Sequence, residues 1–359
     1  MASQRSPEPP SKVATAELRA RLAQVVPELA ALAARGLPGA VSPTSGASYA
    51  VTGVGGSAGP ARLLVATLRS LGLRARFVPL SAFVHGGVVA RAAGAAGQTG
   101  EAGETLCVFS QGLSPNARLA LASASSFASA SLFTSEPASS PLLEGFVARG
   151  GRVLTLAPAE ESGTLLRVVG PPVAMLAAVL FAHEVAGAPL PAAALAALPS
   201  ELEAAAAGAR AAIAALPRFA LAAGTRVAFV TSGEAGERGL DCGLGLKWVE
   251  GLGVDEPPTW DVLEIAHGPF HAFYTETRLL VTLGDSALYD RLEAMLVPER
   301  HALLRLPTRA DAPLARLALE PAVNELLIAA FERAPRNLAE WPSKGLDAPL
   351  YAIDEALRR

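Results

Sequence analysis

Apolar runs that end in glycine turns and lead into helical repeats are the feature that most constrains the fold of this chain. Residues 49–52 form such a run before Gly53-Val-Gly-Gly-Ser57, and apolar side chains then recur at helical spacing over 61–71. Residues 105–110 lead in the same way into a loop at 111–116. Several runs are apolar without alternation, as in strands that are covered on both faces. We therefore predict a doubly wound parallel α/β sheet between two layers of helices.

The same order of elements is predicted a second time, beyond an alanine-rich, proline-containing stretch at 185–223. A strand is expected at 227–231, a glycine turn at 232–236 and a helix at 239–252, and a further strand and helix follow. The element order repeats although the sequence does not, which favours duplication of one α/β unit.

A chain of 359 residues is long enough for two domains of ordinary size. We place the first domain at 16–190, beginning with an amphipathic helix kinked at Pro27, and the second at 191–333, beginning with the helical linker. Residues 1–15 are polar and proline-rich and are predicted to form a disordered tail. Residues 334–359 are predicted to form a C-terminal tail that packs on the active site.

Composition excludes several classes of function. Charged residues make up 18% of the chain and the net charge is −3, which gives no electrostatic basis for binding nucleic acid. Cys107 and Cys242 form no CxxC or Cys/His pattern, so neither a disulfide framework nor a zinc site is suggested and a reducing, cytoplasmic location is expected. No metal or organic cofactor is predicted. The apolar run at 172–182 is shorter than the ~20 residues that span a bilayer, so no membrane partner is expected.

Two loops that follow predicted strands combine glycines with hydroxyl and amide side chains. They carry Gly55, Ser57, Ser110, Gln111, Ser114 and Asn116. At the carboxyl edge of a parallel sheet, such loops and the following helix can bind a phosphate group. The alternative is that these residues are turn and N-cap residues. A dinucleotide fingerprint is rejected because the second strand, at 74–78, is basic where an acidic residue is required.

Two further motifs carry acid–base side chains. Lys247 and Glu250 lie one turn apart on a predicted helix, either as an exposed ion pair or, if buried, as a tunable acid–base pair. His267 ends an apolar run before Gly-Pro, a place suited to a catalytic imidazole and equally to one that bonds a backbone carbonyl.

Taken together, these motifs resemble the sugar-isomerase (SIS) domain family, in particular the isomerase half of glucosamine-6-phosphate synthase and related isomerases and deaminases. Ser57 and Ser110-Gln111 match the family's phosphate loops. Leu246-Lys-Trp-Val-Glu250, Glu264-Ile-Ala-His267-Gly-Pro269 and Pro335-Arg-Asn-Leu-Ala-Glu340 match its later motifs in order. The resemblance implies two tandem flavodoxin-like, three-layer αβα SIS domains.

The resemblance also implies roles. Glu250 would move a proton between C1 and C2 of an open-chain sugar phosphate or amino-sugar phosphate, and Lys247 would offset the developing charge or tune Glu250. His267 would assist ring opening from a neighbouring subunit, which implies a homodimer with a shared site. The two loops would hold the phosphate. Glu264, Arg336, Asn337 and Lys344 are secondary candidates.

The sequence departs from the family at three places. The loop at 110–116 lacks one hydroxyl, nothing at 165–173 matches the family's Val-Ala-Ser-Thr-Lys segment, and Glu340 stands where the family has a lysine. No glutaminase domain precedes the first α/β unit, so synthase activity is not expected. The leading prediction is an isomerase or deaminase that acts through an enediol or enolamine. The alternatives are a non-catalytic phosphosugar sensor and, last, a structural protein in which Glu250 and His267 have no chemical role.

Overall fold

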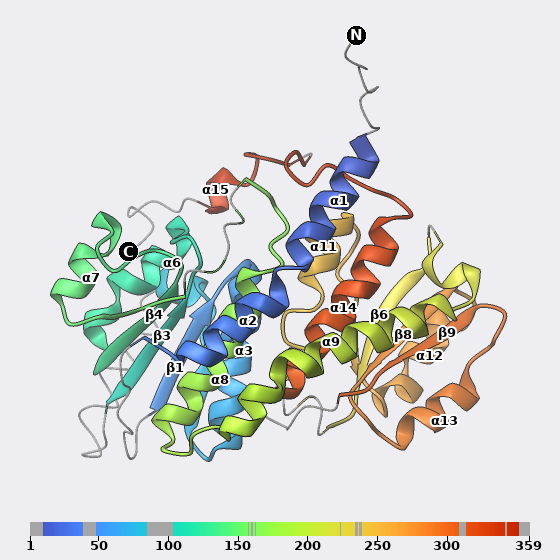
Figure 1. Ribbon diagram of the computed structural model, residues 1–359, viewed down its shortest axis with the longest axis horizontal. Helices are drawn as coiled ribbons and strands as arrows, with labels where there is room; N and C mark the ends of the chain where they lie inside the picture. Colours follow the sequence, from blue (N-terminus) through green and yellow to red (C-terminus); the bar gives the residue numbers. More distant parts are fainter. Residues whose placement is uncertain are drawn as a thin grey trace, which may run out of the picture.

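The computed structural model is built around two parallel β-sheets that lie side by side (Figure 1). It describes residues 10–38, 48–84, 103–156, 158, 161, 163–222, 224–233, 236, 239–308, 314–341 and 343–351. His85 and the last eight residues of the predicted C-terminal tail lie outside the described residues. None of the described helices is both long and apolar enough to cross a lipid bilayer.

The first sheet has the strand order β2-β1-β3-β4-β5, and every neighbouring pair is parallel. The strands are β1 (Ser48–Gly53), β2 (Arg74–Phe77), β3 (Glu104–Phe109), β4 (Ser129–Thr134) and β5 (Arg152–Thr155). Alternate residues enter different cores, because successive side chains of a strand point to opposite faces. Val51 and Cys107 pack on one face of the sheet, whereas Ala50 and Leu106 pack on the other. The predicted doubly wound parallel sheet is therefore confirmed.

The second sheet repeats the arrangement with one strand fewer, in the order β7-β6-β8-β9. Its parallel strands are β6 (Arg226–Thr231), β7 (Thr259–Asp261), β8 (Arg278–Leu283) and β9 (His301–Leu306). In both sheets the strand order reverses direction next to the first strand, between β1 and β3 and between β6 and β8. Such a switch point opens a crevice at the carboxyl ends of the strands.

Helices cover both faces of each sheet. On the first sheet, one face carries α3 (Ala58–Ser70) and α8 (Gly170–Val185), and the other carries α4 (Ser81–Val84), α6 (Pro115–Ala122) and α7 (Glu144–Ala148). On the second, α9 (Ala192–Ala214), α11 (Leu246–Leu252) and α14 (Ala315–Phe331) oppose α12 (Pro269–Phe273) and α13 (Leu288–Met295). The remaining short helices are η1 (Gly55–Ser57), η2 (Ala124–Ser126), η3 (Pro141–Leu143), η4 (Arg218–Leu221), η5 (Glu264–His267) and α15 (Ala348–Tyr351).

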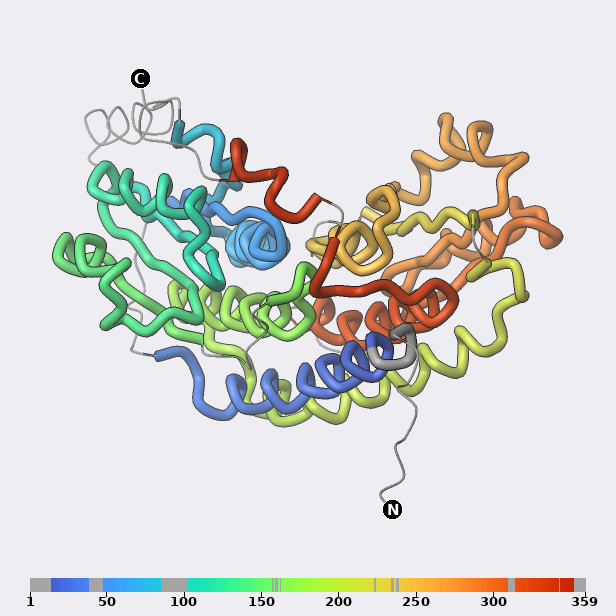
Figure 2. Tube along the Cα trace, turned by 90° about the horizontal axis from the view of Figure 1, so that it is seen from above, coloured from blue at the N-terminus to red at the C-terminus, as the bar shows by residue number. Residues whose placement is uncertain are grey.

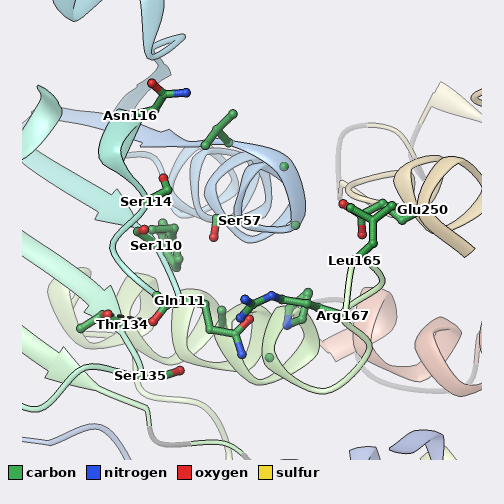
Figure 3. A pocket seen from close by; sticks show the side chains of 18 of the residues that line it. Ser57, Ser110, Gln111, Ser114, Asn116, Thr134, Ser135, Leu165, Arg167 and Glu250 are labelled. Atoms are coloured by element: carbon green, nitrogen blue, oxygen red, sulfur yellow. Dashed lines mark hydrogen bonds between the residues drawn. The ribbon is translucent and has the colours of Figure 1, made fainter. Parts of the chain in front are cut away.

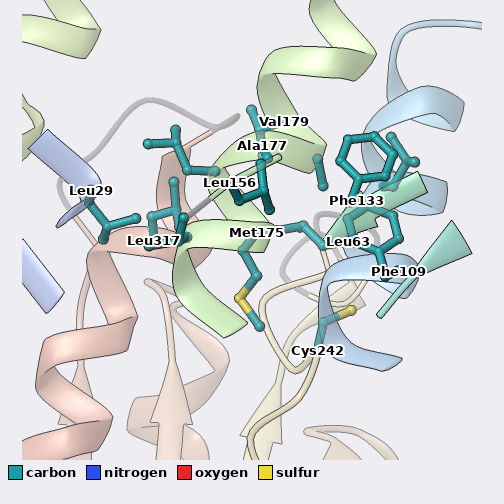
Figure 4. Packing of buried hydrophobic residues seen from close by; sticks show 14 of the residues in the cluster. Leu29, Leu63, Phe109, Phe133, Leu156, Met175, Ala177, Val179, Cys242 and Leu317 are labelled. Carbon is teal, nitrogen blue, oxygen red and sulfur yellow. The ribbon is translucent and has the colours of Figure 1, made fainter. Parts of the chain in front are cut away.

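A layer of helices joins the two sheets (Figure 2). It contains α1 (Pro10–Leu22), α2 (Val25–Arg35), α8, α9 and α14. Leu29 of α2, Met175 of α8 and Leu317 of α14 belong to one buried cluster, which also holds Cys107 and continues to the first sheet (Figure 4). The joint between the domains is thus part of a continuous hydrophobic core.

The start of the chain differs from the prediction at two points. Helix α1 begins at Pro10, inside the segment expected to be a disordered tail, and it is held by buried Leu18 and by an ion pair from Arg19 to Glu332. The predicted kinked helix is two helices. The chain turns at 23–24, and Pro27 lies in the first turn of α2, where its missing N–H leaves no hydrogen bond unmade.

Candidate active site

A cavity of about 540 Å³ lies at the carboxyl ends of β1 and β3, where the strand order of the first sheet reverses. Its size lies within the usual range for small-molecule sites. The loops after β1 and β3, the segment before α8, helix α11 and the C-terminal segment all contribute to its wall. The candidate residues that line it are Gly55, Ser57, Ser110, Gln111, Ser114, Asn116 and Glu250 (Figure 3).

Backbone geometry explains the glycines of the first loop. Gly55 has φ of +57°, a left-handed conformation that favours glycine. A Cβ atom on Gly53 would stand 2.4 Å from the Ser57 carbonyl oxygen, so only glycine lets the turn close. The loop therefore brings Ser57 to the end of β1, and α3 begins directly after it.

The second loop places Ser110, Gln111 and Ser114 around the same cavity (Figure 3). Ser114 is the N-cap of α6, and its Oγ accepts a hydrogen bond of 3.3 Å from the Ala117 N–H. The N-cap alternative therefore holds for Ser114, although its side chain also faces the cavity. Leu113, which precedes Ser114, is fully buried and has φ of +49°. This backbone conformation is strained for a leucine, and strained residues are concentrated at functional sites.

Glu161 holds the part of the cavity wall that lies beside Gln111. Its buried carboxylate accepts hydrogen bonds from the N–H groups of Val168, Val169 and Gly170, at 2.6, 3.0 and 2.7 Å. Gly170 lies against the end of the Gln111 side chain, and a Cβ atom on Gly170 would stand 2.3 Å from the Gln111 side-chain oxygen and force that side chain to move. These contacts fix the segment before α8, and Arg167 of that segment lines the cavity.

Glu250 projects from α11 toward the cavity, on the side opposite the serines (Figure 3). Burial raises the pKa of its carboxyl group from the ordinary 4.5 to about 7, against the opposing effect of the Arg167 charge and of a hydrogen bond from the Arg167 backbone. The negative charge of Glu161 raises the pKa further. A carboxyl group with a pKa near neutrality can both accept and return a proton.

Lys247 lies outside the cavity wall, which corrects the expectation that it faces the ligand. Its ammonium group is buried against the Glu320 carboxylate and lies 2.6 Å from Asn324 Oδ1. Burial alone would raise the pKa of Glu320, but Lys247 and Arg316 hold it below its ordinary value. Helix α14 therefore draws Lys247 into an ion pair, whereas Glu250, one turn further along α11, lines the cavity.

His267 and Glu264 are likewise not among the lining residues. They belong to η5, which packs through Ile265 on one face of the second sheet, whereas Trp248 of α11 packs on the other face. Both side chains are exposed. The structure thus places η5, which carries His267, and α11, which carries Glu250, on opposite faces of the second sheet.

The C-terminal segment reaches the cavity through residues that were not predicted. Trp341, Asp347 and Tyr351 line the cavity, and the Asn116 amide donates a hydrogen bond of 3.1 Å to the Leu350 carbonyl oxygen. Figure 2 shows this segment crossing from the second domain to the first.

The three predicted candidates of this segment do not line the cavity. The Arg336 guanidinium occupies the space beside Gly253. Asn337 accepts a hydrogen bond from the Ala339 N–H, and Lys344 is bound to Glu340 at 2.9 Å.

Arg167 is the functional candidate that the sequence did not reveal. It stands alone between apolar residues, in the segment where a serine–threonine motif was expected and nothing matched. A single arginine in an apolar stretch was the available signal. Within the described residues, no group of three or more His, Cys, Asp or Glu side chains could hold a metal ion.

Comparison with protein-family models and with curated protein sequences gives no match for this chain. Comparison with solved structures gives several. Glucosamine-6-phosphate deaminase from Thermotoga maritima is 17% identical with a TM-score of 0.60, over 90% of this chain and 93% of that one. Tagatose-6-phosphate ketose/aldose isomerase from Escherichia coli is 14% identical with a TM-score of 0.62, over 94% and 98%.

The C-terminal domain of glucosamine-fructose-6-phosphate aminotransferase from Francisella tularensis is 10% identical with a TM-score of 0.63, over 87% of this chain and 94% of that one. At these identities the likeness concerns the fold, and it extends over nearly the full length of each compared chain. With two parallel sheets that match those of the compared proteins, the chain has the fold of the double sugar-isomerase-domain proteins.

Proposed function

We propose that the cavity binds a phosphorylated sugar or amino sugar in the cytoplasm, and that the chain isomerises or deaminates it with Glu250 as the base. The observation that carries the proposal is the position of Glu250, which has a pKa near 7 and faces the two serine-bearing loops across the cavity (Figure 3). An anion site and a neutral-range carboxylate at opposite ends of one cavity suit a substrate with a phosphate at one end and a carbonyl at the other.

The proposed isomerisation needs no external oxidant or reductant. Glu250 takes the proton from C2 of the open-chain aldose, the C–H electron pair forms the C1–C2 double bond, and the carbonyl π pair becomes a lone pair on O1. Transfer of the hydroxyl proton from O2 to O1 and return of the first proton to C1 give the ketose. An amino-sugar phosphate would pass through the equivalent enolamine and release ammonia by hydrolysis of the resulting imine.

We further propose that the active unit is a homodimer in which His267 of one subunit completes the cavity of the other. The support is geometric, because His267 is exposed and lies on the face of the second sheet opposite α11. Its neighbours Leu263 and Tyr274 are large, half-exposed apolar side chains, at 60% and 49% exposure, of the kind that subunit interfaces cover.

A phosphosugar sensor without catalytic activity is the second candidate. It is favoured by the burial of Lys247 in an ion pair with Glu320 and by Glu340 in place of the family's lysine. The first feature withdraws the lysine to which the resemblance gives a role beside Glu250, and the second leaves out the family's C-terminal lysine.

A thermal-shift screen against hexose and amino-hexose phosphates, followed by product analysis, separates these functions. We expect a phosphosugar to raise the melting temperature of the wild type and of Glu250→Gln alike, because a ligand that binds only the folded state stabilises it. Only the wild type should convert the ligand. The matched control is Glu299→Gln, which changes an exposed glutamate of the second domain and should behave as wild type. Binding without conversion would favour the sensor, and absence of binding would refute both candidates.

A further inference from the structure

The described residues that line the cavity include more acidic than basic side chains. Among the described lining residues, Arg167 carries the positive charge, whereas Glu250 and Asp347 are acidic. The other cations considered for this site have different partners. Lys247 is paired with Glu320, and Lys344 is paired with Glu340.

The Arg167 side chain lies in the cavity between Gln111, which belongs to the second serine-bearing loop, and Glu250 of α11 (Figure 3). The backbone next to Arg167 is fixed, because the N–H groups of the three following residues donate hydrogen bonds to the Glu161 carboxylate. A second connection comes from α1, whose Arg21 donates a hydrogen bond of 2.6 Å to the Thr164 hydroxyl. The guanidinium therefore stands in a cavity whose supporting backbone is already hydrogen-bonded.

Proton removal from C2 would create an oxyanion beside two carboxyl groups. They are Glu250, which lines the cavity, and Glu161, which lies beneath the segment that carries Arg167. The charges of Glu161 and Arg167 both act on Glu250. Charge that develops in a partly dehydrated site needs a preorganised donor. A planar guanidinium with several N–H groups can donate to two neighbouring oxygen atoms at once.

We propose that Arg167 is a catalytic residue that donates to the O1 and O2 atoms of the enediolate, the charge-offsetting role that the resemblance assigned to Lys247. The inference rests on the proposed isomerase or deaminase function and adds a residue to it. Glu161 is then a positioning residue, which acts by holding the Arg167 segment against the cavity.

The test compares Arg167→Gln and Arg167→Lys with the wild type and with Arg291→Gln, which changes an exposed arginine on α13. For Arg167→Gln we expect kcat to fall about 100-fold or more with little change in ligand-induced thermal shift, because the lost interaction forms only in the transition state. Arg167→Lys should recover part of kcat. Arg291→Gln should match the wild type.

A second readout follows Glu250 directly and does not depend on turnover. Because the guanidinium lowers the pKa of Glu250, its removal should move the Glu250 titration, measured by NMR on labelled glutamate, to higher pH in Arg167→Gln and leave it in place in Arg167→Lys. The acidic limb of the activity profile should move in the same direction.

The outcomes separate the two levels of the proposal. An unchanged kcat, or a loss confined to KM, would overturn the assignment of Arg167 while the proposed function stands. If the wild type binds phosphosugars without converting them, the proposed catalysis fails and the role of Arg167 in it fails too. If Glu250 titrates at the same pH in Arg167→Gln as in the wild type, this result would also count against the assignment.

Discussion

At the scale of the side chain, Lys247 and Glu250 have different environments although they are only three residues apart in the sequence. They lie one turn apart on α11, yet one lines the cavity and the other is enclosed beside Glu320 and Asn324. Glu250 could be predicted from its motif because the helix and its spacing are local features. The ion pair of Lys247 could not be predicted from the sequence, because its partner Glu320 lies 73 residues away.

The raised pKa of Glu250 makes the stability of the protein depend on pH. The fold favours the protonated carboxyl, so this stabilisation is complete below about pH 4.5 and is lost as the pH rises through about 7. Glu250→Gln removes this dependence. We expect the variant to gain stability relative to the wild type between pH 4.5 and 8, by roughly 1–3 kcal/mol given the partial exposure of the group.

Urea unfolding of the wild type and of Glu250→Gln at the two ends of this pH range measures the difference in their free energies of unfolding. Glu299→Gln, an exposed site, is the control and should follow the wild type. A constant difference between wild type and Glu250→Gln across this range would contradict a raised pKa.

At the scale of elements, α11 and α14 are joined by buried charges. Glu320 accepts from Lys247 and from Arg316 at 2.9 Å, and Arg316 also donates to the Cys242 carbonyl oxygen. Removal of one partner from a buried ion pair is costly because the other charge remains without compensation. The central member of this group should therefore be the most sensitive to substitution.

We expect Glu320→Gln to destabilise the protein by about 3–5 kcal/mol, since it leaves two buried cations facing each other. Lys247→Met should cost clearly less, because Arg316 still neutralises Glu320. Chemical denaturation of the two variants gives the comparison. The opposite order would mean that Lys247 and not Glu320 is the centre of the group.

The same scale shows what sequence patterns predict well. The long apolar strands before glycine turns, such as β1, β3 and β6, were placed within a few residues. The strands β7 and β9 were missed: β7 has only three residues, and β9 carries Arg305 between leucines because its edge is exposed. Short or edge strands take their structure from their neighbours and leave a weak pattern.

For the whole molecule, the two sheets repeat a strand order but carry different side chains at its switch point. A hollow at the corresponding edge of the second sheet is bordered by Asp285, Asp290 and Arg305, and Arg305 is already paired with Asp290. The two aspartates would repel a phosphate. Helix α11 beside the second sheet instead contributes Glu250 to the cavity at the first sheet, so the two α/β units differ in what they place at their switch points.

The proposed shared site predicts complementation between two inactive variants. In a mixed dimer of Glu250→Gln and His267→Asn, one cavity contains both substitutions and the other contains an intact Glu250 and an intact His267. The mixed dimer should therefore have about half of the wild-type activity if His267 acts across a two-fold interface. Co-expression with two affinity tags and assay of the doubly purified species measures it. A mixture as inactive as its parents would refute the shared site.

The wall of the cavity extends from Val54 to Tyr351, and this span has a consequence for synthesis on the ribosome. The two serine-bearing loops emerge first, and the first domain can fold around them while the rest of the chain is still being made. Glu250 and then Trp341 are made only after the whole first sheet, whose last strand ends at Thr155, has been synthesised. A nascent chain therefore has the two serine-bearing loops long before it has Glu250, and the cavity wall is complete only in a chain that has been made through Tyr351.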